Sequence, residues 1–375
     1  MRRTVASETP AKADRLPGKF PRDRFLRSGA GMANPIPLCV LWFGDKSSWE
    51  GPWIEKVLLE KIPHRTYVYP ELPESDSEAV LLIFSCIQRE PHQNVVLVID
   101  RYRSVTILTL SDEKIRHDYR HYGKAKIMRP YYSPFSAWNL RTHAIPVGFH
   151  NAFGRKTGGP PENRSANRTY PWAFFGQVKN RARQEMLQNF ANLTEMFGPS
   201  PTHFTSSFAA SDSTSGAVIA EIFDQTYFVP CPMGNRNPDS FRVMEALERG
   251  AIPVVVRFYG LDYFKFTFGN HPFIVGKNWR DAARKCRELL ENPEEISRKH
   301  HEVQEWYEIF IKELQDEFSA MLPIGSTKVA WPTPLRIRQV FQSFNPYVVF
   351  VFWLHFRFPD IRKRLFGLLD QLRSR

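Results

Sequence analysis

The 375-residue sequence is poor in cysteine and lacks the patterns that cysteine-based sites require. Its four cysteines, Cys39, Cys86, Cys231 and Cys286, lie far apart and form no C-x-x-C pair. Neither a disulfide framework nor a structural zinc site is therefore expected. We expect isolated, buried thiols instead.

Long hydrophobic runs are also missing. No apolar segment reaches the roughly 18 residues that a membrane-spanning helix needs, and the N-terminus lacks the apolar core of a signal peptide. The best candidate, Tyr347–Phe356, is too short to span a bilayer unaided. We expect it to pack on a core as a helix or strand, and the alternative is a peripheral contact with a membrane surface. The compartment stays open between cytoplasm and Golgi lumen, and a Golgi-type enzyme would need an anchor that this sequence does not show.

Acidic residues are too few to balance the basic ones. The chain has 51 Lys and Arg against 39 Asp and Glu, a net charge of +12, which predicts an anionic partner. The partner could be nucleic acid, anionic lipid or a phosphorylated small molecule. However, the sequence has no zinc-finger spacing, no RNP-like aromatic pair and no P-loop. Nucleic acid is therefore not the expected partner, although a non-catalytic protein that binds nucleic acid or another polyanion is the alternative function.

Apolar and aromatic residues are abundant, at 42% and 14%, and 375 residues exceed what one core usually holds. Strands alternating with helical stretches predict an α/β fold with mostly parallel sheets. In the first half, the predicted strands are Leu38–Phe43, Val95–Ile99, Val105–Leu110, Lys126–Met128 and Ala144–Val147. We divide the chain into a disordered basic arm (1–35), a first Rossmann-like lobe (36–153), a linker (154–168), a second Rossmann-like lobe (169–330) and a C-terminal basic and apolar extension (331–375).

The most informative segment, Phe228–Val256, has the order strand, Pro/Gly/Asn-rich loop, helix, Gly, strand. Ligands of open parallel sheets bind beyond the carboxyl ends of the strands, so the loop Cys231–Asp239 lies where a ligand is expected. Asp239 or Ser240 can cap the helix, and Gly250 can end it.

Arg242 then falls in the first turn of this helix, where a cation opposes the helix dipole. Free N–H groups at a helix start favour an anion, so Arg242 is best explained by a neighbouring phosphate or carboxylate. Glu245 lies three residues further on the same face, where a carboxylate suits the two hydroxyls of a ribose. The alternative is a solvated Arg–Glu pair worth about 0.2–0.5 kcal/mol.

The pattern C-P-x-G-x, D-S-x-R-x-x-E-A-L-x-x-G-x-I-P-V over residues 231–254 resembles the donor-binding half of the exostosin-type glycosyltransferases (family 47) and of the related ribitol xylosyltransferases. Four further segments resemble the family more loosely: Leu108–Glu113, Ile127–Tyr132, Ile145–Phe149 and Trp172–Arg183. The resemblance implies a GT-B fold, with two Rossmann-like lobes around a central cleft. The second lobe would hold the nucleotide sugar and the first lobe the acceptor.

Carried over to this sequence, the resemblance assigns Arg242 to the donor diphosphate and Glu245 to the ribose. The donor-binding residues that we predict are Gly176, Lys179, Arg181, Arg183, Gly234, Asn235, Ser240, Arg242 and Glu245. Asn237 stands where many GT-B enzymes place a second acidic residue, so the sugar contacts of this loop stay undetermined. No Asp-x-Asp motif stands at a strand end. We therefore expect Arg, Lys and the helix dipole to neutralise the diphosphate without a metal, and we predict no cofactor.

The implied function is an inverting transfer of a hexose or pentose from a nucleotide-diphosphate sugar, such as a UDP-sugar, to a saccharide or glycan hydroxyl. A general base must take the proton of that hydroxyl. Asp112 and Glu113 are the predicted catalytic residues, because they end a strand of the first lobe and would face the donor. Alternatively, Asp112 begins a helix over Lys114–Tyr122, and His150 is a second candidate base.

Overall fold

The computed structural model describes most of the chain between residues 38 and 357. The described ranges are 38–44, 50–73, 79–86, 93–123, 125–139, 141–150, 153, 168–178, 180–206, 214–324 and 334–357. The predicted arm, nearly all of the predicted linker and Lys179 lie outside them. The predicted domain boundaries stay predictions.

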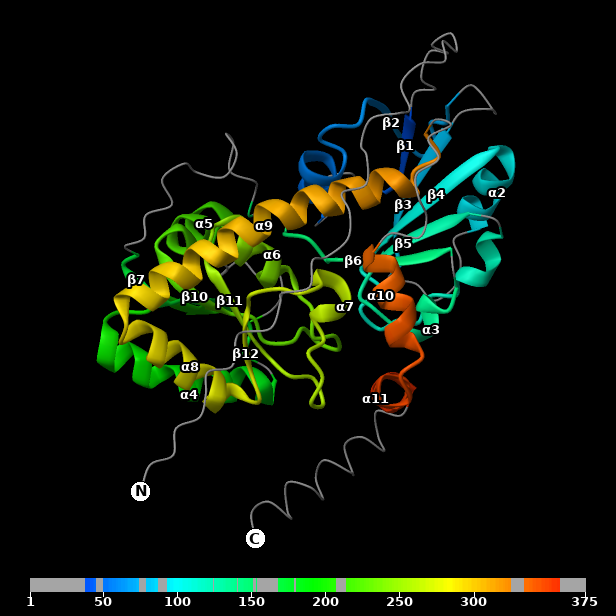
Figure 1. The fold of residues 1–375 in the computed structure, drawn as a ribbon. Helices are drawn as coiled ribbons and strands as arrows, with labels where there is room; N and C mark the ends of the chain where they lie inside the picture. Colours follow the sequence, from blue (N-terminus) through cyan, green and yellow to red (C-terminus); the bar gives the residue numbers. More distant parts are fainter. Residues whose placement is uncertain are drawn as a thin grey trace, which may run out of the picture. The chain divides into compact units, whose positions relative to one another are not determined.

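The first sheet has six parallel strands in the order β2-β1-β3-β4-β5-β6 (Figure 1). They are β1 (Leu38–Phe43), β2 (His64–Val68), β3 (Ala79–Ser85), β4 (Ser104–Leu110), β5 (Lys126–Pro130) and β6 (Thr142–Ile145). Leu38 and Val40 of β1 join one hydrophobic core, whereas Cys39 and Leu41 join another. Both faces of this sheet are therefore buried, which explains the continuous apolar runs of its central strands.

Helices connect these strands, and one of them corrects a prediction. They are α1 (Gly51–Trp53), the π-helical turn η1 (Ile54–Leu58), α2 (Gln93–Arg101), the 3₁₀ turn η2 (Tyr119–Tyr122) and α3 (Pro134–Ala137). Val95–Ile99, predicted as a strand, lies in α2 because Val95, Val98 and Ile99 are buried at helical spacing. A helix over Lys114–Tyr122 is wrong as well, since only η2 forms there, capped by Asp118.

In the second sheet, the direction in which the chain adds successive strands reverses at one point. Its four parallel strands have the order β12-β11-β10-β7, and the pair β8-β9 adjoins β7. The strands are β7 (Tyr170–Trp172), β8 (Phe174–Gly176), β9 (Thr202–Phe204), β10 (Thr226–Pro230), β11 (Ile252–Val256) and β12 (Ile274–Gly276). Only Ala173 separates β7 from β8, and its amide donates to the carbonyl of Phe228 in β10. The chain therefore passes from β8 to β9 on one side of the β7–β8 segment, and it later returns to β10 on the other side of that segment. This switch point is where ligands of open α/β sheets bind.

Six helices of the described residues accompany these strands. They are α4 (Arg181–Phe197), α5 (Gly216–Asp224), α6 (Phe241–Glu248), α7 (Lys265–Phe268), α8 (Trp279–Leu290) and α9 (Pro293–Met321). Asn180 caps α4 by accepting from the amide of Arg183, and Ser240 occupies the N-cap position of α6. The predicted α/β class with two Rossmann-like regions is confirmed.

The long helix α9 connects the second sheet's helices to the first sheet (Figure 1). The side chain of Gln315 donates to the carbonyl of Val57 at 2.8 Å, and Thr106 of β4 donates to the carbonyl of Met321 at 2.8 Å. The chain continues into α10 (Pro334–Ser343) and α11 (Pro346–Arg357). In the described part of the chain, no helix combines the length and the apolar composition needed to cross a bilayer.

Candidate functional site

A cavity of ≈ 240 Å³ lies at the switch point of the second sheet. The segments that follow β8, β9 and β10 line it, together with the first turns of α5 and α6. Six of the predicted donor-binding residues meet here: Gly176, Arg183, Asn235, Ser240, Arg242 and Glu245. Residues separated by up to 69 positions in the sequence are thus brought into one concave site.

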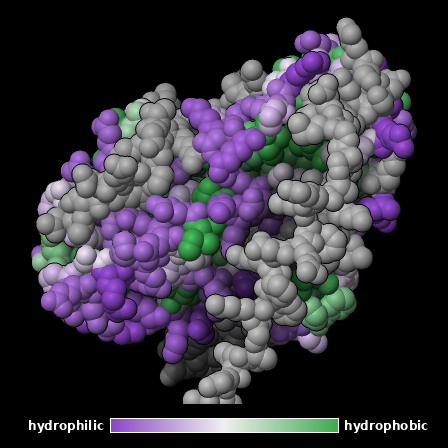
Figure 2. All heavy atoms as spheres, turned by 45° about the horizontal axis from the view of Figure 1, so that its top comes forward, coloured by the Kyte–Doolittle hydropathy of each residue, from purple (hydrophilic) through white to green (hydrophobic). Residues whose placement is uncertain are grey.

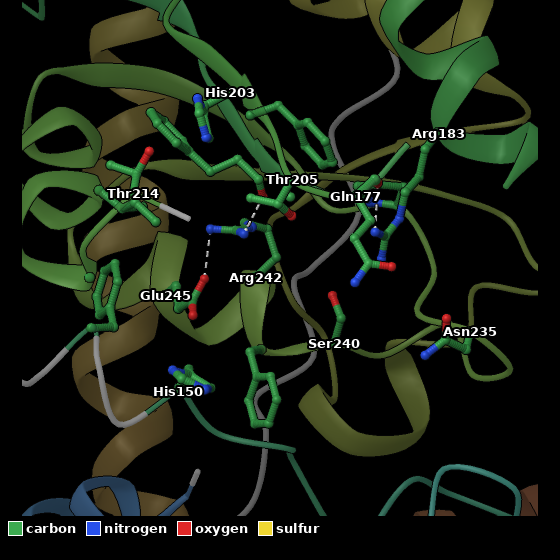
Figure 3. A pocket seen from close by; sticks show the side chains of 18 residues that line it. His150, Gln177, Arg183, His203, Thr205, Thr214, Asn235, Ser240, Arg242 and Glu245 are labelled. Atoms are coloured by element: carbon green, nitrogen blue, oxygen red, sulfur yellow. Dashed lines mark hydrogen bonds and ion pairs between the residues drawn. The ribbon is translucent and has the colours of Figure 1, made fainter. Parts of the chain in front are cut away.

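Arg242 is held in the centre of this cavity (Figure 3). One guanidinium nitrogen donates to the carbonyl of Phe175, and Nη1 lies 2.8 Å from Oε2 of Glu245. The guanidinium also lies over the ring of Phe223, at 5.4 Å. The Arg242–Glu245 pair is largely buried, with side-chain exposures of 18% and 7%, so it differs from the solvated pair considered as the alternative.

A second guanidinium, that of Arg183, points to the same place from α4. Its Nη1 donates to the carbonyl of Gln177 at 2.7 Å. Burial lowers the pKa of Arg183, and the positive charge of Arg242 lowers it further. Gly176 lies beside both groups, because a Cβ built on it would lie 3.9 Å from Nη2 of Arg242 and 4.0 Å from Nη1 of Arg183. Two cations that repel each other around a glycine form a site for an anion.

One polar atom at the rim of the cavity lacks a hydrogen-bond partner among the described residues. The hydroxyl of Ser240 is buried and has no hydrogen-bond partner in the described part of the chain. Buried hydroxyls are nearly always hydrogen-bonded, so this atom indicates a ligand or an ordered water. Asn235 lines the same side of the cavity (Figure 3).

The opposite end of the cavity was not found by sequence reasoning. His203 of β9 and Thr205, which directly follows this strand, line it with Thr214 and Ile219 of the α5 region (Figure 3). β9 has only three residues and offers almost no apolar pattern, so it is difficult to predict from the sequence. The residues of this end therefore carried no signal in the sequence.

Two other predicted residues lie outside this cavity. Arg181 and Gly234 line a second cavity of ≈ 570 Å³ that also borders the loop Cys231–Asp239. The side chain of Arg181 is 72% exposed, and its Nε donates to Glu185 at 2.7 Å. Residues i and i+2 of a helix face different directions, so Arg181 and Arg183 are separated at the start of α4.

The two predicted catalytic carboxylates have different surroundings. Asp112 is buried, and its Oδ2 lies 2.8 Å from Nη2 of Arg129, itself fully buried. The hydroxyl of Tyr119 and the amide of Arg116 donate to the same carboxylate, both at 3.0 Å. Asp112 is therefore engaged by the first lobe on both of its oxygens.

Glu113 instead reaches from the end of β4 to the loop after β10. Its Oε1 accepts from the amides of Arg236, at 2.7 Å, and Asn237, at 3.3 Å. A Cβ at Gly234 would lie 2.6 Å from this oxygen, so a side chain there would displace the carboxylate. Both hydrogen bonds use Oε1, so Oε2 takes no part in holding the loop. Glu113 thus joins the two Rossmann-like regions while keeping one oxygen available.

The same loop is held from its other side by α11. Nε2 of His355 lies 2.6 Å from the carbonyl of Arg236, and Nδ1 lies 3.1 Å from the hydroxyl of Tyr259. A carbonyl can only accept, so Nε2 carries the proton and Nδ1 accepts from the tyrosine. Glu113 holds the amide of Arg236 and His355 holds its carbonyl, next to Asn235 in the cavity wall.

Residues 156–324 match the family model described as RXYLT1 C-terminal domain. The matched segment contains the whole second sheet and every residue that lines the ≈ 240 Å³ cavity except His150 and Phe153. The match supports the predicted resemblance to the ribitol xylosyltransferases, and hence a glycosyltransferase of the RXYLT1 type. The exostosin part of the resemblance stays a prediction.

Two of the solved structures that this chain resembles are glycosyltransferases, and both are similar to it only at a low level. One is the β-glucosyltransferase of phage T4 in complex with UDP-glucose, with 13% sequence identity and a TM-score of 0.45, covering 76% of this chain and 99% of that one. The other is an α1,3-fucosyltransferase, with 11% identity and a TM-score of 0.42, covering 77% and 93%. No curated protein matches the sequence.

Two buried carboxyls outside the predicted set adjoin the loop and the first lobe. Burial raises the pKa of Glu50 to about 8 and that of Asp239 to about 7, although nearby backbone amides oppose both shifts. The backbone amide of Ser111 lies close to the carboxyl of Glu50. The amides of Val147 and Ser240 lie close to the carboxyl of Asp239 but form no hydrogen bond with it. At pH 7 the carboxyl of Glu50 is therefore mostly protonated, and that of Asp239 is about half protonated.

The shift at Glu50 makes stability depend on pH. A raised carboxyl pKa stabilises the fold fully below the unfolded value of 4.5, and this contribution is lost as the pH rises towards about 8. Because one pKa unit corresponds to about 1.4 kcal/mol, the loss is on the order of a few kcal/mol. We expect the melting temperature of the wild type to fall between pH 5.5 and 8.5, and that of Glu50→Gln to fall several degrees less. The exposed Glu308→Gln is the control, and a Glu50→Gln profile parallel to the wild type would contradict the assignment.

Proposed function

We propose that this chain is an inverting glycosyltransferase that moves a hexose or pentose from a UDP-sugar to a saccharide or glycan hydroxyl. The observation that carries the proposal is the convergence of Arg183 and Arg242 beside Gly176, with Glu245 one helical turn away, at the switch point of a parallel sheet. The match of residues 156–324 supports the same class of enzyme.

In this proposal the donor diphosphate lies between the two guanidinium groups and the amide end of α6. Arg242 would pair with the phosphates as well as with Glu245. The Glu245 carboxylate could then also accept hydrogen bonds from the ribose hydroxyls. The nucleobase of the donor would lie at the end of the cavity lined by His203 and Thr205. The transferred sugar would lie near Ser240 and Asn235. The preference for uracil rests on the family resemblance.

Glu113 is the general base that we propose. Its available oxygen takes the proton of the acceptor hydroxyl as that oxygen attacks the anomeric carbon. The bond between this carbon and the phosphate oxygen breaks on the opposite face, which inverts the configuration. The nucleoside diphosphate leaves with its charge stabilised by Arg242, Arg183 and the helix dipole, without a metal ion.

The neighbouring candidates are less suited to this role. Asp112 is neutralised by Arg129 and accepts two further hydrogen bonds, so its oxygens are occupied. His150 lines the cavity beside Phe241, and burial lowers its pKa, so its imidazole is neutral at pH 7. It is the second candidate base.

Within the described residues, no group of three or more His, Cys, Asp or Glu side chains could hold a metal ion.

The function is tested by incubating the full chain with nucleotide sugars and simple saccharide acceptors. Release of UDP should depend on the acceptor and persist in EDTA, and NMR of the product should show an inverted anomeric centre. A product of retained configuration would contradict the mechanism. A protein that binds DNA or heparin in a salt-sensitive manner, without binding any nucleotide sugar, would favour the polyanion-binding alternative.

Replacing His355 with alanine is expected to raise the KM for the donor about fivefold, since a lost hydrogen bond costs about 1 kcal/mol and the loop carrying Asn235 loosens. The turnover number should change less, because His355 does not line the ≈ 240 Å³ cavity. His301→Ala, which removes an exposed histidine of α9, is the matched control. Equal KM values for the two variants would show that α11 does not position the loop.

A further inference from the structure

The helices α10 and α11 carry an unusual concentration of exposed apolar side chains. Thirteen large hydrophobic residues are exposed in the described part of the chain, and six of them fall within 17 consecutive positions. These six are Ile337, Phe341, Phe344, Tyr347, Phe350 and Trp353, with exposures of 41% to 74%. We call them the aromatic face. On the side of the molecule shown in Figure 2, hydrophilic residues cover most of the coloured surface, and hydrophobic residues form smaller patches.

The aromatic face is held outward by the opposite sides of the two helices. In α10, Arg336 donates to the carbonyl of Ala137 at 2.8 Å, and Gln339 donates to the carbonyl of Ala144 at 2.8 Å. In α11, Val348, Val351 and Phe352 are buried in the core. The exposed positions follow helical spacing on the other side, so neither helix can turn them inward without losing its buried contacts.

The composition of this face is typical of a lipid interface. Five of its six residues are aromatic, and Trp138 of the first lobe adjoins it. Nε1 of Trp138 donates to the carbonyl of Ser343 at 3.0 Å, and the residue is 47% exposed. Aromatic rings are enriched where a protein meets the headgroup region of a bilayer. A half-exposed indole whose polar end is satisfied within the protein fits this position.

The sequence that follows α11 is basic. Residues 357–375 contain six Lys and Arg against two Asp. Arg362, Lys363 and Arg364 come within seven positions of Arg357 in the sequence. Apolar aromatic groups flanked by clustered basic residues bind anionic lipid surfaces, by burying apolar area and by attraction to headgroups. A second copy of this chain would instead bring two such basic segments together.

We propose that the aromatic face of α10 and α11 docks this protein on an anionic membrane surface. The attachment is peripheral and reversible, since no residue of the face belongs to a membrane-spanning segment. It does not depend on the proposed sugar transfer.

The experiment is co-sedimentation of the full chain with phosphatidylcholine vesicles, with and without phosphatidylserine. The wild type should sediment with the mixed vesicles, weakly with phosphatidylcholine alone, and less at high salt. The variant Phe341→Ser/Phe344→Ser/Phe350→Ser should bind about tenfold more weakly, because the apolar area that enters the interface is reduced. The matched control, Leu97→Ser/Met196→Ser/Ile309→Ser, removes three equally exposed apolar residues elsewhere and should bind like the wild type.

Three outcomes would overturn the proposal: a wild type that sediments with neither vesicle, a triple phenylalanine variant that binds like the control, or a wild-type dimer that this variant dissociates. Light scattering detects the dimer. Unchanged melting temperatures of the variants show that they fold.

Discussion

Replacing Arg242 with alanine is expected to weaken the binding of UDP by about a hundredfold or more. Removing one partner of a buried, hydrogen-bonded charge pair costs about 2–5 kcal/mol, and each 1.4 kcal/mol corresponds to a factor of ten. The variant loses the proposed phosphate contact and leaves Glu245 buried without its ion pair. Titration calorimetry with UDP measures the loss.

Arg181→Ala is the matched control, because this arginine is exposed, pairs with Glu185 and lies outside the ≈ 240 Å³ cavity. It should bind UDP like the wild type. Arg242→Ala/Glu245→Gln removes the unpaired carboxylate, so it separates loss of binding from loss of folding. Comparable losses in Arg181→Ala and Arg242→Ala would place the diphosphate elsewhere.

Replacing Glu113 with glutamine is expected to lower the turnover number by about a hundredfold to ten-thousandfold, the range of a lost general base. The amide oxygen can still accept from the backbone of Arg236, so the loop and the affinity for UDP should change little. Steady-state kinetics should therefore show a loss in kcat with a nearly constant KM for the donor.

Substitutions of Asp112 and His150 test whether the loss of turnover is specific to Glu113. Asp112→Asn breaks a buried ion pair, which costs about 3–5 kcal/mol of stability, so its main effect should be a lower melting temperature. His150→Gln tests the second candidate base. Normal turnover in Glu113→Gln, together with a loss in His150→Gln, would transfer the role of base to the histidine.

The segments that could be predicted are those whose local pattern and tertiary environment agree. The stretch from β10 to β11 has strong strand runs, a Pro/Gly-rich loop and a helix ended by Gly250, and the structure follows that order. In contrast, Val95–Ile99 is a short apolar run that fits a strand or a buried helix equally well by composition. The edge strand β2 is polar and half-exposed, so its pairing with β1 leaves little trace in the sequence.

In the candidate site too, the sequence predicts contacts within one helix but not contacts between distant segments. Arg242 and Glu245 share a helix, so their spacing alone places them on one face. Which of Asp112 and Glu113 crosses to the loop depends on the turn at Ser111, which adopts a φ of 60°, and on Arg129, a partner 17 positions away. His355 acts on a residue 119 positions earlier. No local motif encodes such contacts, because packing across the whole chain creates them.

The central claim is that the switch point of the second sheet holds a nucleoside diphosphate. Titration calorimetry of the full chain with UDP in EDTA tests it most directly. We expect binding of one UDP per chain, greatly weakened in Arg242→Ala and unchanged in Arg181→Ala. A folded protein that binds neither UDP nor any other nucleoside diphosphate would contradict it.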